Sequence, residues 1–106
     1  MNFLQIKLTQ GNINQGHFYL QDCRNFFPAA SFGGKNKSLA GIPISVMFDG
    51  TGESVETDID ATKRLFRVAR GQSKRFISFF SCKAGDTIYI HQDAPGYYRV
   101  SMRKPS

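Results

Sequence analysis

Apolar and polar residues alternate near the N-terminus, as they do in a β-strand with one buried face. Leu4, Ile6 and Leu8 take turns with polar neighbours, which predicts a first strand. The segment TQGNINQG (residues 9–16) is typical of a loop because it is rich in Gly, Asn and Gln. The apolar pattern resumes in HFYL (17–20), so a second strand is expected after a long polar loop.

The next part of the chain predicts a short helix followed by a loop. QDCRNFFP (21–28) favours one or two helical turns, since Asp22 can cap the start and Pro28 prevents continuation. Residues 29–41 include Gly33 and Gly34 and have turn composition, so we expect a flexible loop there.

The clearest hairpin lies in the middle of the chain. IPISVMF (42–48) and SVETDID (54–60) both alternate, and DGTGE (49–53) between them supplies turn residues. The apolar positions of this hairpin are predicted to face inward. Glu56, Asp58 and Asp60 are then expected to form an acidic stripe on its outer face.

The C-terminal half predicts a strand, a helix and a second hairpin. The apolar residues of LFRV (65–68) suggest the strand, and Ser73 is expected to cap a helix over 74–82 that ends before Gly85 and closes one end of a barrel. TIYIH (87–91) and YRVSM (98–102), joined by QDAPGY (92–97), predict the final hairpin.

About seven short strands and two short helices favour a mainly β fold: a seven-stranded, open antiparallel pseudobarrel. A chain of 106 residues is expected to form one domain, residues 1–106, because a core split in two would bury too little apolar surface. The abrupt end at SMRKPS (101–106) suggests a domain cut from a longer chain.

Composition adds a cellular setting to this fold. No apolar run approaches the roughly 20 residues that span a bilayer, and the N-terminus has no secretion signal, so we expect a cytoplasmic protein without a membrane partner. Cys23 and Cys82 form no CxxC pair and are interpreted as reduced thiols.

Charge is unevenly distributed, which makes nucleic acid the first partner to consider. The net charge is +6. Six of the fourteen Lys and Arg residues lie between Lys63 and Arg75, and five of the eight acidic residues lie between Asp49 and Asp60. A cluster of cations is the electrostatic footprint of a nucleic-acid-binding surface.

Catalytic and metal-binding patterns are weaker. Asp49, Glu56, Asp58 and Lys63 are residue types that a magnesium-dependent nuclease uses, but they lack the usual spacing of two carboxylates before a lysine on one strand. A small metal-dependent nuclease remains an alternative. His17 and His91 have no second ligand at metal spacing, so we predict no metal site.

Two segments carry side chains suited to reading DNA. The guanidinium of Arg pairs bidentately with guanine, whereas Lys acts mainly as a point charge on phosphate. The basic stretch TKRLFRVARGQSKRF (62–76) offers both residue types, and the amides of QGNINQGH (10–17) can pair with adenine or bridge to phosphates.

The order of these parts resembles a known family. FLQIKLTQGNINQGHFYLQDCRNFFP (3–28) resembles the opening of the B-three type DNA-binding pseudobarrel, and SKRFISFFSCKAGDTIYI (73–90) resembles its second helix and the strand that follows. Plant transcription factors use this fold, as do specificity domains of some bacterial restriction endonucleases. FLQIKLT (3–9) and TKRLFRVARG (62–71) are most similar to the N-terminal effector domain of EcoRII-like restriction endonucleases.

The resemblance implies two arms, residues 10–17 and 61–70, that hold duplex DNA in the major groove. It implies a bacterial, monomeric recognition or effector domain that binds a specific sequence, for the EcoRII-like group a CC(A/T)GG-type site. The domain itself is expected to have no catalytic site and no cofactor, with Mg²⁺ used by a linked nuclease domain. The expected DNA-binding residues are Gln10, Asn12, Asn14, Gln15, His17, Lys35, Lys37, Lys63, Arg64, Arg67, Arg70, Lys74 and Arg75.

A single-stranded nucleic-acid or RNA-binding barrel is a second alternative, because exposed aromatic residues such as Tyr19, Tyr89 and Tyr97 could stack on bases. A protein-interaction module with incidental charge is a third.

Overall fold

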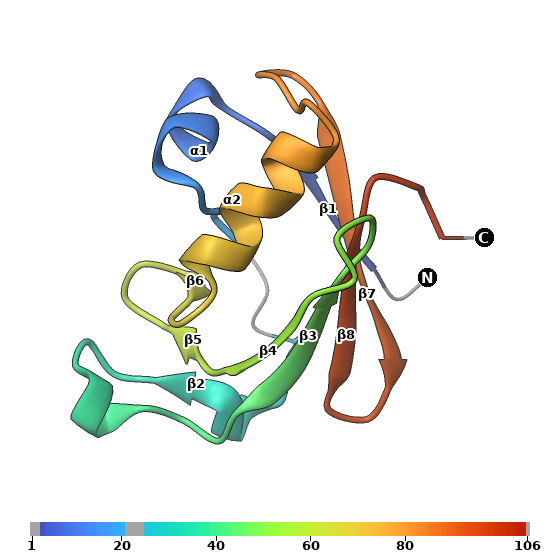
Figure 1. The fold of residues 1–106 in the computed structure, drawn as a ribbon. Coiled ribbons are helices and arrows are strands. Elements are labelled where there is room, and N and C mark those ends of the chain that lie inside the picture. The colour runs from blue at the N-terminus through green and yellow to red at the C-terminus, as the bar shows by residue number, and fades with distance from the viewer. Residues whose placement is uncertain (1–2, 21–24, 106) are drawn as a thin grey trace.

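Two β-sheets and two short α-helices form the described part of the chain, residues 3–20 and 25–105 of a computed structural model (Figure 1). In chain order the elements are β1 (Phe3–Lys7), α1 (Gln10–Gln15), the 3₁₀ turn η1 (Ala29–Ser31), β2 (Phe32–Gly33), the 3₁₀ turn η2 (Lys37–Leu39), β3 (Ile44–Phe48), β4 (Ser54–Thr57), β5 (Ile59–Asp60), β6 (Leu65–Phe66), α2 (Arg70–Phe79), β7 (Thr87–Ala94) and β8 (Tyr97–Ser101).

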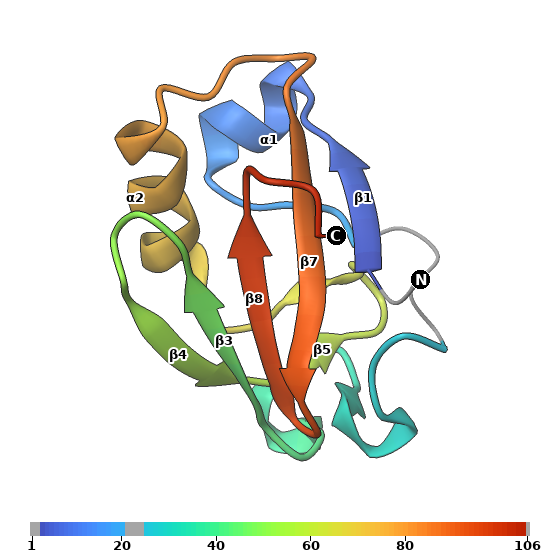
Figure 2. The same cartoon turned by 90° about the vertical axis from the view of Figure 1, so that its right-hand side faces the viewer.

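The larger sheet contains five strands in the order β1-β7-β8-β3-β4 (Figure 2). The hairpins β3–β4 and β7–β8 are antiparallel, and β1 pairs antiparallel with β7, Leu4 lying opposite Ile90. The two hairpins meet through a parallel pair of strands, β3 and β8, in which Val46 lies opposite Tyr98. The predicted central and final hairpins are therefore present, joined into one mixed sheet.

The smaller sheet has three short strands in the order β2-β5-β6. β2 runs parallel to β5, and β5 runs antiparallel to β6. This sheet and both α-helices lie on the same side of the larger sheet (Figure 1). None of the described helices is long and apolar enough to cross a membrane.

The hydrophobic core fills the space between the larger sheet and these elements. α2 contributes Phe76, whose ring packs edge-on against Phe18 and tilted against Phe48. The other fully buried apolar residues come from strands, from Leu8 just after β1 and from the segment after α1, and include Ile6, Leu8, Leu20, Val46, Ile59, Ile88, Ile90 and Val100. Burial on this scale stabilises the fold by roughly 25 cal/mol for each Å² of apolar surface removed from water.

The architecture differs from the predicted one in strand number and direction. The described residues form eight strands in two mixed sheets and no closed barrel, whereas the sequence predicted seven antiparallel strands. The mainly β character and the number of short helices agree with the prediction, although α1 lies in a segment predicted as a loop. β6 covers the first two residues of the strand predicted at 65–68, and β5 is the end of the strand predicted at 54–60, placed in the smaller sheet. β2 lies in a predicted loop, because alternation cannot be recognised over two positions.

Three predicted elements are wrong and one lies outside the described residues. The polar loop 9–16 contains helix α1, and HFYL (17–20) is not a strand, although Phe18 and Leu20 are buried. Helix α2 begins at Arg70, so Ser73 lies inside the helix and does not cap it. The helix start predicted at Asp22 lies outside the described residues.

The acidic stripe is also wrong. Glu56 is exposed, but Asp58 and Asp60 are only 4% and 5% exposed. The chain leaves the large sheet after Thr57 and enters the small one at Ile59, so the alternation of the hairpin does not continue through these two aspartates. Both carboxylates are used inside the protein.

Candidate nucleic-acid interface

Helix α1 is stabilised at its N-terminal end by a capping box between Thr9 and Asn12. The Thr9 hydroxyl accepts a hydrogen bond from the Asn12 backbone N–H, and the Asn12 side chain accepts one from the Thr9 N–H. This reciprocal pair satisfies two N–H groups that a helix start leaves free. Asn12 is only 2% exposed, so this residue of the predicted DNA-binding set stabilises the helix from within the protein.

The other polar residues of α1 remain at the surface. The Gln10 side-chain amide donates to Asn14 Oδ1 over 2.9 Å, and both residues are exposed. The exposed Gln15 lies at the end of the helix, where its backbone carbonyl accepts a hydrogen bond from Arg70 Nε at 3.0 Å. This bond ties the end of α1 to the start of α2.

Gly16 ends α1 in the left-handed conformation, with φ of 70°. A Cβ atom at this position would come within 2.5 Å of Lys74 Cγ. The stem of Lys74 therefore passes directly over Gly16, which places the Lys74 ammonium group beside the end of α1. α1 and α2 thus present their cationic and amide groups together.

The loop between β5 and β6 is a tight turn held by Asp60. The Asp60 carboxylate accepts hydrogen bonds from the N–H groups of Thr62 and Lys63, and its carbonyl accepts one from the Arg64 N–H. Arg64 adopts a φ of 57°, which is uncommon for a residue other than glycine. The buried acid therefore orders a turn that exposes Lys63 and Arg64.

Arg67 is fixed inside the protein by a network of acceptors. Its Nε and Nη2 atoms donate to the two carboxylate oxygens of Asp58 over 2.7 and 3.0 Å. Nη2 also donates to the Gly34 carbonyl over 2.6 Å, and Nη1 donates to the Lys35 carbonyl over 3.4 Å. Because most of its donors already have partners, Arg67 connects the small sheet to the loop that carries Lys35.

The Asp58 carboxylate is fully satisfied as an anion. Burial raises the pKa of Asp58, but the hydrogen bonds from Arg67 and from the Gly41 N–H, together with the charge of Arg67, hold this pKa below its ordinary value. The Asp58–Arg67 pair therefore stays ionised at neutral pH and adds no net charge to the surface above it.

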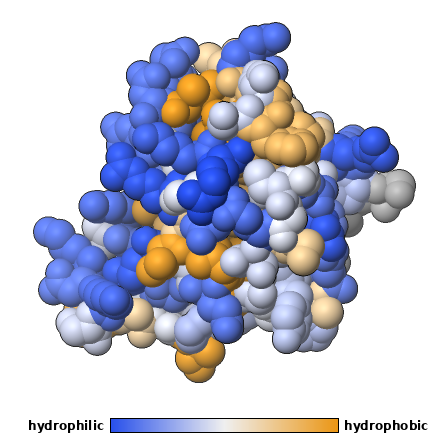
Figure 3. Space-filling view, viewed as in Figure 1, coloured by the Kyte–Doolittle hydropathy of each residue, from blue (hydrophilic) through white to orange (hydrophobic). Residues whose placement is uncertain are grey.

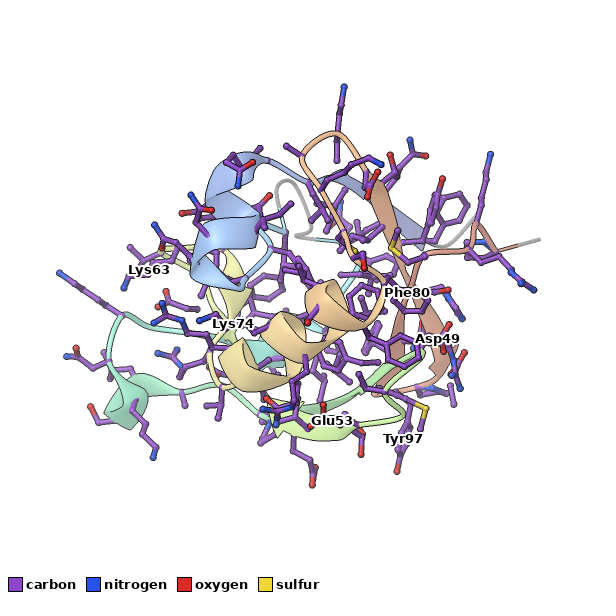
Figure 4. The ribbon with its side chains drawn as sticks, turned by 45° about the horizontal axis from the view of Figure 1, so that its top comes forward. Asp49, Glu53, Lys63, Lys74, Phe80 and Tyr97 are labelled. Atoms are coloured by element: carbon purple, nitrogen blue, oxygen red, sulfur yellow. The ribbon has the colours of Figure 1, made fainter. Side chains whose placement is uncertain are left out.

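A hollow of about 240 Å³ opens between the end of α1, the β5–β6 loop and the first turn of α2. Polar and cationic side chains line its rim, and apolar groups lie at its base. The lining residues are Gln15, His17, Phe18, Lys63, Leu65, Phe66, Arg67, Ala69, Arg70 and Ser73. Lys63 and Lys74 lie on the α1 side of the molecule, away from Asp49 and Tyr97 (Figure 4). Hydrophilic residues cover most of this side (Figure 3).

His17 lies in the wall of this hollow. Its ring stacks edge-on against Tyr19, with centroids 5.0 Å apart, and its Nε2 atom is buried without a hydrogen-bond partner among the described residues. Burial, with smaller contributions from the charges of Arg70 and Lys63, lowers the pKa of His17. The imidazole is therefore neutral at physiological pH in the free protein.

The structure brings together most of the predicted DNA-binding residues. Gln15, His17, Lys63 and Arg70 line one hollow, Lys74 lies beside it, and Arg64 is next to Lys63. Lys35 and Lys37 are exposed on the loop that Arg67 holds in place. Arg70 begins α2 and does not lie on the predicted strand.

Arg75 is the predicted site residue that lies apart. Its guanidinium forms a bidentate ion pair with Glu53 of the β3–β4 turn, at distances of 2.8 to 3.0 Å. This pair compensates the charge of Arg75 at the far edge of α2, next to the central hairpin. Arg75 therefore contributes less to the cationic surface than its place in the basic stretch suggested.

Ser73 is a site residue that the sequence pattern did not reveal. It was assigned to a helix cap, but it lies in the second turn of α2, is 2% exposed and lines the hollow. The true N-cap is Ala69, which has no side-chain oxygen to bond the free N–H groups of the first turn. Because α2 begins about one turn earlier than predicted, Ser73 lies on the face of the helix that lines the hollow.

The carboxylates proposed for a magnesium-dependent nuclease do not converge. Asp49 accepts a hydrogen bond from Arg99 over 2.7 Å, and Asp58 is held by Arg67. Within residues 3–20 and 25–105, no group of three or more His, Cys, Asp or Glu side chains is arranged to hold a metal ion.

Comparison with known proteins yields a likeness of fold. No protein-family model and no curated protein matches the sequence significantly. The N-terminal domain of Helicobacter pylori LlaJI.R1 has a similar structure, with a TM-score of 0.67 and 10% sequence identity. The match covers 94% of this chain and 85% of that domain. At this identity the comparison establishes a shared fold.

Proposed function

We propose that this chain is a sequence-specific duplex DNA-binding domain whose interface is the surface formed by α1, the β5–β6 loop and the first two turns of α2, with the loop bearing Lys35 and Lys37. The observation that carries the proposal is the separation of charge on this surface. Asp58 and Asp60 are turned inward and neutralised, while Lys63, Arg64, Arg70 and Lys74 are exposed. Unpaired cations gathered on one face attract the phosphate backbone.

The structural neighbour supports this proposal at the level of fold. Its name, LlaJI.R1, follows the convention for restriction enzymes, and the matched part is an N-terminal domain. A fold can serve several functions, so the argument rests on the surface and the neighbour adds weight to it.

We propose that the base sequence is read by amide groups on α1 and by guanidinium groups on the β5–β6 loop and at the start of α2. Gln10, Asn14 and Gln15 on α1 offer the bidentate pattern that suits adenine, and Arg64 and Arg70 offer the pattern that suits guanine. Lys35, Lys37 and Lys74 would contact phosphates and set the orientation of the domain. Both of these parts, α1 and the β5–β6 loop with the start of α2, would enter the major groove, as the B-three resemblance implies.

We further propose that cleavage belongs to a separate nuclease domain that uses Mg²⁺, and that this domain contributes recognition as a monomer. The carboxylates of Asp49 and Asp58 are engaged in ion pairs, and we assign them no catalytic step.

A strand-preference experiment tests the proposal against the single-stranded alternative. We expect duplex DNA to bind more tightly than single-stranded DNA or RNA of the same sequence, because the exposed polar groups on this face are cations and amides and Tyr19 is the one exposed aromatic residue described beside the hollow. Fluorescence anisotropy over a series of salt concentrations should show log affinity falling linearly with log salt, with a slope of about −0.9 for each phosphate contact in B-DNA. Tighter binding to either single strand would contradict the proposal and favour base stacking on exposed aromatic residues.

A further inference from the structure

Polar groups of His17 and Ser73 line the hollow beside the first turn of α2. The Nε2 atom of His17 is buried without a hydrogen-bond partner among the described residues. Ser73, which is 2% exposed, adds a side-chain hydroxyl to the same wall, and its backbone N–H is bonded to the Ala69 carbonyl. A buried polar atom without a partner costs free energy, so the free ring nitrogen of His17 in this polar hollow indicates a polar ligand.

The charges around Ser73 define the class of that ligand. Lys63 and Arg70 line the same hollow, and Arg70 uses only Nε for its bond to Gln15, which leaves its two Nη groups without partners among the described residues. Arg67 in the wall is neutralised by Asp58, and none of the described residues that line the hollow has an acidic side chain. The ligand is therefore an anion with several acceptor oxygens.

The size of the hollow favours a phosphate over a larger ligand. Its volume of about 240 Å³ lies below the roughly 300 Å³ at which sites for drug-sized molecules begin. The first turn of α2 adds further donors, because its N-cap is Ala69 and no side chain caps it.

We infer that this hollow holds one backbone phosphate of the bound duplex, which accepts a hydrogen bond from the Ser73 hydroxyl and lies between Lys63 and Arg70. The inference rests on the proposed DNA-binding function and adds to it a specific anchoring contact. This contact fixes the end of α1 and the start of α2 against one strand, and so sets the register in which the exposed side chains of α1 meet the bases.

A pair of serine variants on the same helix tests the contact. Ser73→Ala should weaken duplex binding about tenfold, the loss expected for one hydrogen bond to a charged group. Ser78→Ala, at an exposed position of α2 that does not line the hollow, is the matched control and should bind as the wild type does. Both changes favour helix formation, and unfolding curves would verify that each variant is folded.

A scan with uncharged phosphate analogues shows which phosphate of the duplex contacts Ser73. A short duplex of fixed sequence is prepared with a single uncharged methylphosphonate at each successive position. At one position the wild type should lose more affinity than Ser73→Ala, because the variant has already lost the serine contact there and keeps only those of Lys63 and Arg70. Equal losses for both proteins at every position, or a Ser73→Ala variant that binds as the wild type does, would overturn the inference while leaving duplex binding intact.

The imidazole of His17 reports on the same site independently. Burial and the charges of Arg70 and Lys63 lower its pKa in the free protein, with Arg67 and Lys74 as the other cations nearby. A phosphate in the hollow offsets those charges, so the pKa of His17 measured by NMR should rise when duplex is added. A rise with inorganic phosphate in a protein that binds no duplex would refute the proposed function and with it the DNA contact.

Discussion

Replacing Arg67 by alanine is expected to lower the free energy of unfolding by about 3–5 kcal/mol, the range seen when one partner of a buried ion pair is removed. The substitution would leave the Asp58 carboxylate buried with no counter-ion and would free the Gly34 carbonyl that Arg67 Nη2 bonds. A domain of this size is stable by only about 5–15 kcal/mol, so the loss is a large part of the total. Urea unfolding followed by circular dichroism measures it.

Two variants separate this explanation from a general effect of lost charge. Arg75→Ala removes the same charge from the exposed pair with Glu53 and should change stability little, since exposed ion pairs contribute little. The double change Arg67→Met with Asp58→Asn removes both charges while Asn keeps an acceptor for Gly41, and it should recover much of the lost stability. An Arg67→Ala protein as stable as the Arg75→Ala protein would show that the buried pair is not structural.

Replacing both Lys63 and Arg70 by glutamine is expected to weaken duplex binding by at least tenfold at moderate salt and to reduce the salt slope by about 2. Both side chains lie on the rim of the hollow, one on the β5–β6 loop and one at the start of α2. Their loss removes two cations from the proposed interface and no buried ion pair. Anisotropy titrations at several salt concentrations provide both quantities.

The matched control removes two cations from the other side of the molecule. Arg103 and Lys104 are exposed near the C-terminal end of the described chain, which Figure 1 places on the side opposite α1. Changing both to glutamine gives the same net charge as the Lys63 and Arg70 double variant. If the two double variants lose affinity equally, the binding depends on overall charge and the assigned face is wrong.

Strand pattern was the most predictable feature of this fold. The hairpins that became β3–β4 and β7–β8 were evident because four or more residues alternate in each strand and Gly-containing turns join them. The pairing of β3 with β8 was not predictable, since it joins residues about fifty positions apart and leaves no local signal. The pairing of the short strands β2, β5 and β6 into a second sheet left no local signal either, although β5 and β6 lie within predicted strands.

The errors in the candidate site have local physical causes. Asn12 completes the capping box of α1, where Glu or Gln is the usual partner, and so a helix start was read as a loop. Ala69 provides no capping side chain, which hid the start of α2 and placed Arg70 and Ser73 in the wrong elements. The hydrophobic periodicity of the sequence does not predict the acidic partners of Arg67 and Arg75 either, because ion pairs between distant segments depend on the tertiary fold.

The uneven distribution of charge along the sequence was informative, and the structure shows how the acidic and basic segments are arranged. Acidic and basic segments adjoin in the sequence. In the structure two of the acidic residues lie beneath the basic surface: Asp58 pairs with Arg67, and Asp60 accepts hydrogen bonds from the turn that carries Lys63. The acids therefore organise the cationic face from below, and they are not a second, outward-facing surface.

Selection of bound duplexes from a random library tests the central claim most directly, because sequence-specific recognition distinguishes a DNA reader from a merely cationic domain. We expect repeated selection to enrich one short motif, with each mismatch costing about 1–3 kcal/mol. The Lys63 and Arg70 double variant should recover that motif poorly, whereas the Arg103 and Lys104 double variant should recover it as the wild type does. A bound pool with no enriched motif, retained equally by every variant, would contradict the account.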